Sequence, residues 1–319
     1  MTKLVSHQSQ RQSGRTLLEL MISLVIGLII IGALLIIYLS TGSAGRQSTS
    51  VSRMNEDAAI SLSFLTSNLR MAGFSQPRVN ASPAAATVDG KRLTSADRNF
   101  VGAGIRGCDN GFANVSDAAT LADLTCATVA GSSAFAIRFE GQTNGLLPEL
   151  RNTLLVGTNA TDCLAQGVAA NTASSLTGSS NFALVESRYF VRVSPSSGTN
   201  ELFCAGNGNA FKPPQPLVQF VDELRVRYGV AASAGDREVS TYLTAAGVDA
   251  LGGTVDDNWA RVISVDVCIV MRSEGRDEAG SGNYLNCDNV STASAGGFLR
   301  RSYRTLVTLR NQSTFARTL

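Results

Sequence analysis

The strongest pattern in the chain is a long apolar stretch close to its beginning. Residues 1–16 are polar and basic, whereas residues 17–40 read LLELMISLVIGLIIIGALLIIYLS and carry a single charged side chain, Glu19. No charged residue occurs from Leu20 to Gly45. A helix over that stretch, at ~1.5 Å per residue, extends ~39 Å, which exceeds the ~30 Å hydrocarbon core of a bilayer. The pattern predicts one membrane-spanning helix.

The helical pattern continues beyond the apolar stretch as an amphipathic stripe. Apolar residues recur at steps of three and four, the spacing of one helix face; they are Val51, Met54, Ala58, Leu62, Leu65, Leu69 and Ala72. Gly73 and Pro77 follow, and such residues commonly end a helix. The sequence therefore predicts one helix from about Thr16 to Ala72, with its second half packed on a globular head.

Alternating patterns predict strands in the remainder of the chain. The expected strands cover residues 133–139, 187–193, 223–228, 262–271 and 302–309. In the second of these, Tyr189, Val191 and Val193 share one face while Arg188 and Arg192 take the other, as in a half-buried strand. Residues 74–132 are expected to form loops with short strands.

Long polar connections separate these strands. The tracts 168–181, 194–200 and 274–297 are predicted to be insertions between strands, and no further helical repeat follows residue 72. Strands of this kind beside one long helix indicate an α+β fold with an antiparallel sheet. We expect four segments: 1–14, 15–45 in the membrane, 46–73 as the amphipathic half of the helix, and 74–319 as a β-rich head.

Composition and charge narrow the function classes. The 319 residues are 44% apolar and 16% charged, with a net charge of +2, so no strongly basic nucleic-acid surface is expected. The single histidine, His7, lies near the beginning of the chain. Histidine triads and histidine-rich zinc sites are therefore disfavoured. We expect no enzyme activity, no metal and no cofactor.

Two weak motifs are better explained as structure. Residues 102–107, GAGIRG, fit the G-x-G-x-x-G pattern, but Cys108-Asp109-Asn110-Gly111 follows where a nucleotide site needs a helix. Asp249, Asp256 and Asp257 could offer oxygen ligands to calcium, yet their spacing fits no EF-hand loop. We expect the three aspartates to be solvated turn residues.

Glu19 decides between three interpretations of the apolar segment. A cleaved secretory signal would have a shorter apolar region and a small-residue cleavage site. A plain signal anchor explains Lys3 and Arg11, which place the N-terminus in the cytoplasm by the positive-inside rule. It does not explain a carboxylate inside the apolar boundary, which is costly in a membrane and usually functional.

The string Ser13-Gly14-Arg15-Thr16-Leu17-Leu18-Glu19 resembles the class III leader junction of type IV pilins and type II secretion pseudopilins. The resemblance implies that a prepilin peptidase cuts after Gly14 and methylates the new N-terminus at Arg15, where the family most often carries Phe. It also implies that Glu19 pairs with the N-terminus of a neighbouring subunit during assembly. Removal of residues 1–14 would take away Lys3 and Arg11, and would bring the 27 basic residues into balance with the 25 acidic ones.

Cysteine usage agrees with a head outside the cytoplasm. All six cysteines follow the membrane segment, with no CxxC pair and no nearby histidine, so disulfides are favoured over zinc. Fifteen pairings are possible. We expect the sequential one: Cys108 with Cys126, Cys163 with Cys204, and Cys268 with Cys287.

Three later segments resemble the PilW family of minor pilins. They are residues 221–230 (VDELRVRYGV), 257–265 (DNWARVISV) and 300–311. This resemblance implies a low-abundance subunit of the type IV pilus, the fibre of twitching motility, that joins other minor pilins in a complex priming pilus assembly or at the fibre tip.

Partners and location follow from the same resemblance. Expected partners are other minor pilins, the major pilin, prepilin peptidase and the inner-membrane assembly platform. The chain would sit in the inner membrane by one helix, with a periplasmic head, before joining the fibre. Two alternatives remain: a type II secretion minor pseudopilin J, and a pilus-tip adhesin or DNA-uptake subunit, although no aromatic and basic cluster typical of nucleic-acid binding stands out.

Overall fold

The computed structural model describes residues 16–75, 87–88, 91–92, 102–117, 119–141, 155–170, 183–233, 235–276 and 282–313. Gly14 and Arg15 lie outside these residues, as do Pro77 and most of the polar tract at 168–181. The chain divides into two compact units, Met1–Ser50 and Val51–Leu319. Each unit is described by itself.

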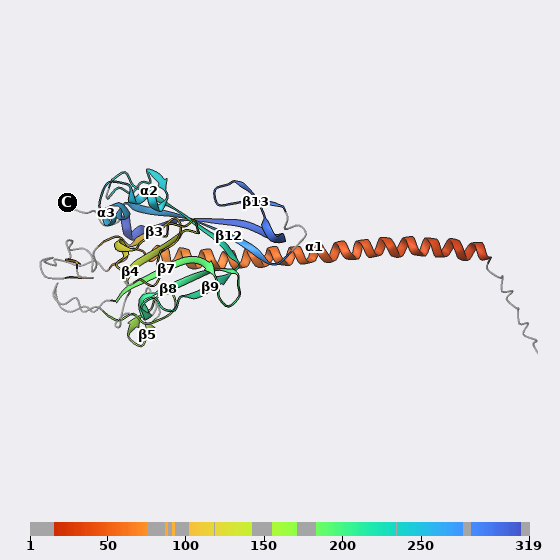
Figure 1. The fold of residues 1–319 in the computed structure, drawn as a ribbon, viewed down its shortest axis with the longest axis horizontal. Helices are drawn as coiled ribbons and strands as arrows, with labels where there is room; N and C mark the ends of the chain where they lie inside the picture. Colours follow the sequence, from red (N-terminus) through yellow and green to blue (C-terminus); the bar gives the residue numbers. More distant parts are fainter. Residues whose placement is uncertain are drawn as a thin grey trace, which may run out of the picture. The chain divides into compact units, whose positions relative to one another are not determined.

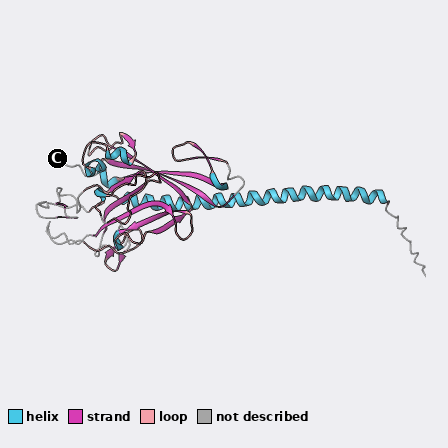
Figure 2. Cartoon of the chain, viewed as in Figure 1, coloured by secondary structure: helices cyan, strands magenta, loops and turns pink. Residues whose placement is uncertain are grey.

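Helix α1 spans Leu17–Met71, which confirms the predicted long helix (Figures 1 and 2). In the first unit its hydroxyl side chains bond back to the helix: Thr41 donates to the Ile37 carbonyl and Thr49 to the Gly45 carbonyl. These bonds satisfy polar groups without a partner from outside the helix. At the other end Gly73 adopts φ +75°, the left-handed conformation that ends many helices. Its N–H donates to the Arg138 carbonyl of the head.

The second unit contains a five-stranded antiparallel sheet in the order β3-β4-β7-β8-β9. Its strands are β3 (Ile105–Cys108), β4 (Ala134–Gly141), β7 (Ala183–Val193), β8 (Asn200–Gly206) and β9 (Gln215–Gln219). The two longest, β4 and β7, overlap the strands predicted at 133–139 and 187–193.

A four-stranded antiparallel sheet in the order β11-β10-β12-β15 completes the head. Its strands are β11 (Thr241–Leu243), β10 (Val221–Val230), β12 (Val262–Arg276) and β15 (Phe298–Thr308). The last three overlap predicted strands. Helices α2 (Ala245–Asp249) and α3 (Val255–Ala260) lie between β11 and β12, and each is capped by a preceding threonine, Thr244 or Thr254.

Short elements fill the connections. The two-stranded pairs are β1 (Thr87–Val88) with β2 (Lys91–Arg92), β5 (Leu155–Val156) with β6 (Asn159–Ala160), and β13 (Asn283–Leu285) with β14 (Ser291–Ala293). The single-turn helices are η1 (Leu121–Asp123), η3 (Asn207–Asn209), η5 (Ala295–Gly297) and α4 (Arg310–Ser313). The tract at 274–297 thus holds the β13–β14 hairpin as an insertion between β12 and β15.

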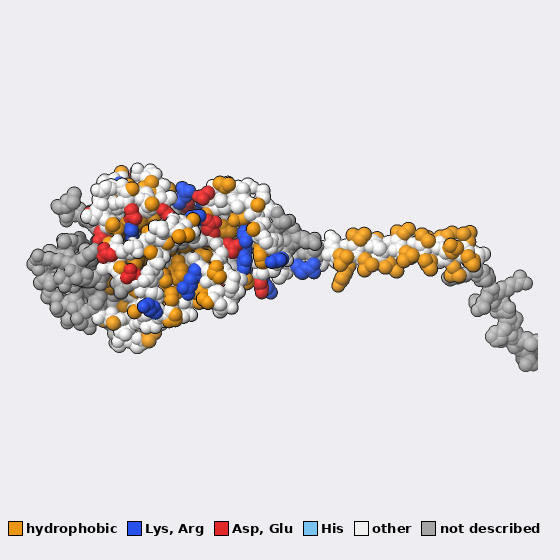
Figure 3. Space-filling model, viewed as in Figure 1, with side chains coloured by type: hydrophobic (Ala, Val, Ile, Leu, Met, Phe, Trp, Pro, Cys, Tyr) orange, Lys and Arg blue, Asp and Glu red, His pale blue; other side chains and the backbone are white. Residues whose placement is uncertain are grey.

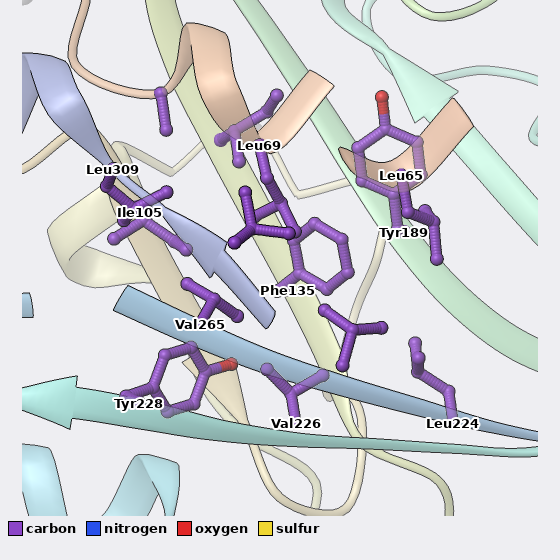
Figure 4. Packing of buried hydrophobic residues seen from close by; sticks show 14 of the residues in the cluster. Leu65, Leu69, Ile105, Phe135, Tyr189, Leu224, Val226, Tyr228, Val265 and Leu309 are labelled. Carbon is purple, nitrogen blue, oxygen red and sulfur yellow. The ribbon is translucent and has the colours of Figure 1, made fainter. Parts of the chain in front are cut away.

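One hydrophobic core joins the second half of α1 to both sheets (Figure 4). The helix contributes Met54, Ala58, Leu65, Leu69 and Ala72, all buried. In Figure 4, Leu65 and Leu69 face Phe135 and Tyr189 of one sheet, with Val265 of the other sheet beyond. Full burial of each leucine stabilises the fold by roughly 1.5–3 kcal/mol. The amphipathic stripe therefore attaches the helix to the head.

The prediction that β7 is half-buried is wrong. Arg188 is fully buried, because residues 112–117 and 119–124 cover the face of the five-stranded sheet opposite the core. Its guanidinium donates to the carbonyls of Val115, Asp117 and Ala119 and stacks over Phe211 at 3.6 Å. Arginine is buried here because its donors bind carbonyls of the covering segment.

Candidate assembly site

Glu19 lies in the first turn of α1, as the third residue of the helix. Its backbone N–H donates to the Thr16 carbonyl at 3.0 Å, and its side chain is exposed. The first-turn position favours a carboxylate, because the helix dipole is positive at this end. Among the described residues Glu19 has no salt-bridge partner.

Apolar side chains cover the first half of α1 (Figure 3), and the neighbours of Glu19 in the sequence, Leu18 and Leu20, are apolar. From Leu17 to Leu39 the large apolar side chains are between 51% and 77% exposed. Within the described residues α1 is the one helix that is long and apolar enough to cross a membrane. Such a surface is stable only when lipid or other apolar helices cover it. A carboxylate in that environment stays charged at a cost unless a cation pairs with it.

Three disulfides fasten long connections to the sheets of the head. They join Cys108 to Cys126, Cys163 to Cys204 and Cys268 to Cys287, the three sequential pairs. The Cα–Cα distances of 5.3, 6.5 and 5.7 Å lie in the range of ordinary disulfides. The third fastens the β13–β14 hairpin to β12, and the described residues include no free cysteine.

The glycines of the 102–107 motif have packing roles. A Cβ at Gly104 would collide with the backbone of Gly73, so this glycine lets the chain pass close to the end of α1. A Cβ at Gly107 would collide with the Tyr228 hydroxyl. The motif leads into β3 and therefore lacks the helix that a nucleotide phosphate would need.

The three aspartates considered for calcium contact protein groups. Asp249 pairs with Arg106 and accepts a hydrogen bond from the Trp259 indole at 2.6 Å. Asp257 accepts a hydrogen bond from Thr254 at 2.6 Å, and the Ala103 N–H donates to Asp256. Asp249 thereby links β3 to the buried tryptophan, which is a structural role.

Two core tyrosines have strongly shifted acidities. Burial raises the pKa of Tyr228 well above its ordinary value, and the negative charge of Asp109 raises it further. Burial also raises the pKa of Tyr189. Both hydroxyls stay protonated at physiological pH, and both tyrosines belong to the hydrophobic core cluster (Figure 4).

Sequence reasoning missed two polar features of the head. The first is the buried set formed by Arg138, Glu186 and Arg188, in which one carboxylate binds two guanidinium groups. The second is a groove between α1 and β15. Its signal was present in the sequence, since Ser63, Thr66, Ser67 and Arg70 repeat at the spacing of a single polar helix face.

Comparison with known protein families decides the identity of the chain. Residues 9–35 match the prokaryotic N-terminal methylation motif, a range that includes Gly14, Arg15 and Glu19. Residues 188–311 match the model of type IV pilus-assembly protein W, from within β7 to α4. The chain is a type IV pilin-like protein with a PilW domain over residues 188–311. It is a pilus-related minor pilin, anchored in the membrane by its apolar helix.

A solved structure resembles the chain over most of its length. A type IV-like pilin from Thermus thermophilus is 11% identical, with 82% of this chain and 98% of that chain covered and a TM-score of 0.38. No curated protein sequence matches the chain significantly. The PilW assignment therefore comes from the two family models and the resemblance of the quoted segments.

Proposed function

We propose that this PilW-family chain is a minor pilin that takes part in type IV pilus assembly, within a minor-pilin complex that primes the fibre or lies at its tip. Prepilin peptidase cuts after Gly14 on the cytoplasmic side and methylates Arg15. Residues 15–45 then hold the chain in the inner membrane as a single span, residues 46–73 continue the helix, and residues 74–319 form the periplasmic head.

Glu19 is the observation that carries this proposal. It is the first carboxylate of α1, and Glu56 and Asp57 are the next along the chain. Cleavage after Gly14 creates an α-ammonium on Arg15, a cation able to pair with a carboxylate. A pair of this kind in an apolar environment is stronger than a surface pair, and loss of one partner leaves the other charge uncompensated. Glu19 of an incoming subunit therefore pairs with the N-terminus of its neighbour and sets their register.

The other partners of the proposal are further pilus subunits. Major pilin and other minor pilins bring apolar helices that cover the exposed surface of α1 when the chain leaves the lipid. The assembly platform in the inner membrane receives the processed chain. The match of residues 188–311 to the PilW model favours the pilus over a type II secretion pseudopilus.

The Glu19→Ala variant tests the proposed role. We expect normal membrane insertion and normal cleavage, but poor association with other minor pilins and few surface pili. Glu56→Ala is the matched control, because Glu56 is also an exposed carboxylate on α1 but lies in the second unit. Piliation is counted by electron microscopy, and association is measured by co-purification. Equal piliation with Glu19→Ala and Glu56→Ala would show that the assigned role is wrong.

A further inference from the structure

An open groove runs between the second half of α1 and strand β15. Its lining residues come from two segments far apart in the sequence: Leu62, Ser63, Thr66, Ser67 and Arg70 on the helix, and Arg304 and Thr305 on the strand. The groove has a volume of about 420 Å³. Hydroxyl side chains form most of the helix side, and Leu62 supplies an apolar contact.

Strand β15 is the end strand of its sheet and presents an unpaired backbone edge. Leu309 donates its N–H to the Ile263 carbonyl, which fixes the alternation of the ladder with β12. In an antiparallel ladder every second residue bonds to the partner strand, and the residues between them point the other way. Ser302, Arg304, Leu306 and Thr308 therefore direct their N–H and C=O groups away from β12. Among the described residues these backbone groups have no hydrogen-bond partner.

The charge at the groove is positive. Arg70 is exposed at the last turn of α1, and its guanidinium has no partner among the described residues. Arg304 also lines the groove, but its guanidinium contacts the Cys287 carbonyl and pairs with Asp266 at 3.6 Å. None of the described residues that line the groove is acidic. A ligand that carries a carboxylate would complement this charge.

The same charges disfavour a second copy of this chain. β15 carries Arg300, Arg301 and Arg304. Asp222 pairs with Arg300 and Asp266 with Arg304, so Arg301 of each copy is the like charge that pairing of two β15 edges would bring together. Charged side chains on an edge commonly prevent such self-association. An acidic segment of a different protein meets no such repulsion.

We infer that the β15 edge binds an extended, acidic segment of another protein, which adds to the four-stranded sheet as a fifth strand beside α1. Main-chain hydrogen bonds to Ser302, Arg304, Leu306 and Thr308 supply affinity. Alternate side chains of the segment enter the groove, where the hydroxyls of Ser63, Thr66 and Ser67 leave space for small residues. A carboxylate of the segment binds Arg70. This inference rests on the head and holds whether or not the pilus role of Glu19 is correct.

A photocrosslinking amino acid at Ser63, in the full chain expressed in its own cells, identifies the bound segment. We expect a crosslink to an extended acidic stretch of another protein, located by mass spectrometry. That stretch, made as a synthetic peptide, is then titrated against the purified full chain in detergent. A crosslink to a second copy of this chain, to a helical segment, or to nothing would overturn the inference.

Two matched pairs of variants measure how much the backbone edge of β15 and the charge of Arg70 contribute to peptide binding. Leu306→Pro removes an outward N–H without breaking the ladder to β12, whereas Leu306→Ala removes only a side chain that is 61% exposed. We expect Leu306→Pro to weaken peptide binding roughly tenfold, because one hydrogen bond is lost, and Leu306→Ala to have little effect. Arg70→Glu, which leaves the core untouched, weakens binding by a similar factor, while Arg53→Glu on the same helix does not.

Equal peptide affinities within both pairs would refute strand addition at β15. Fluorescence of Trp259, the one tryptophan of the chain, shows whether each variant is folded. If Leu306→Pro does not fold, the Arg70 and Arg53 pair decides alone. Failure of the Glu19 experiment leaves these affinities unchanged, so the two proposals fail separately.

Discussion

Glu186 binds two arginine side chains inside the head, and its replacement should destabilise the head strongly. Its Oε2 accepts hydrogen bonds from Arg138 Nε at 3.2 Å and Nη2 at 2.8 Å, and its Oε1 accepts one from Arg188 Nε at 2.8 Å. All three side chains are less than 10% exposed. Glu186→Gln removes the carboxylate charge that binds the buried guanidinium groups of Arg138 and Arg188.

The expected loss of stability in Glu186→Gln follows from the burial of these side chains. Removal of one partner from a buried ion pair costs about 3–5 kcal/mol, because the remaining charge stays desolvated. For a head of this size that loss lowers Tm by roughly 6–20 °C. Arg188 also binds the carbonyls of Val115, Asp117 and Ala119, so we expect the segment over the sheet to loosen first.

Glu274→Gln is the matched control. Glu274 pairs with Arg53 at 2.9 Å, but both side chains are about two-thirds exposed, at 65% and 66%. Exposed pairs contribute at most about 1 kcal/mol. Thermal unfolding of the full chain in detergent is followed by fluorescence of Trp259, which is buried in the head. A Tm for Glu186→Gln that equals the Tm for Glu274→Gln would refute the reasoning.

Two further predictions concern the contact between β3 and β10. Gly107→Ala places a methyl group against the Tyr228 hydroxyl and should destabilise the head by about 1–3 kcal/mol. Gly275→Ala is the control, because its methyl group meets open space. Thermal unfolding compares the two variants, and equal Tm values would contradict the packing at Gly107. Burial raises the pKa of Tyr228, so the unfolded chain loses this proton before the folded chain does, and the head loses stability as pH rises above ~10. Tyr228→Phe should reduce that alkaline loss in unfolding measurements from pH 7 to 11, and an unchanged pH dependence would count against the assignment.

The long helix and the main strands could be predicted because their patterns are local. The apolar run after Leu17 and the stripe from Val51 to Ala72 place both halves of α1 within a residue of the observed ends. The apolar alternation of residues 262–271 likewise locates β12, although the strand continues to Arg276. In both elements the residues that face the core repeat at the period of the element itself.

Contacts between distant segments could not be predicted in the same way. Arg188 alternates with apolar residues as a solvent-facing side chain would, and only the covering residues 112–117 and 119–124 make it buried. Strand β8 contains two polar residues at its start, Asn200 and Glu201, and has no long alternation. Its place between β7 and β9 depends on pairing with both neighbours. For Glu19 the family motif was needed, because one carboxylate in an apolar helix does not reveal its partner.

The N-terminus of the chain in cells provides the most direct test of the pilin assignment. Intact mass and N-terminal sequencing of the purified chain are compared between cells with and without prepilin peptidase. We predict that the chain begins at Arg15, with one added methyl group, when the peptidase is present, and that residues 1–14 are retained when it is absent. The same N-terminus in both kinds of cell, or a cleavage site other than Gly14, would contradict the central claim.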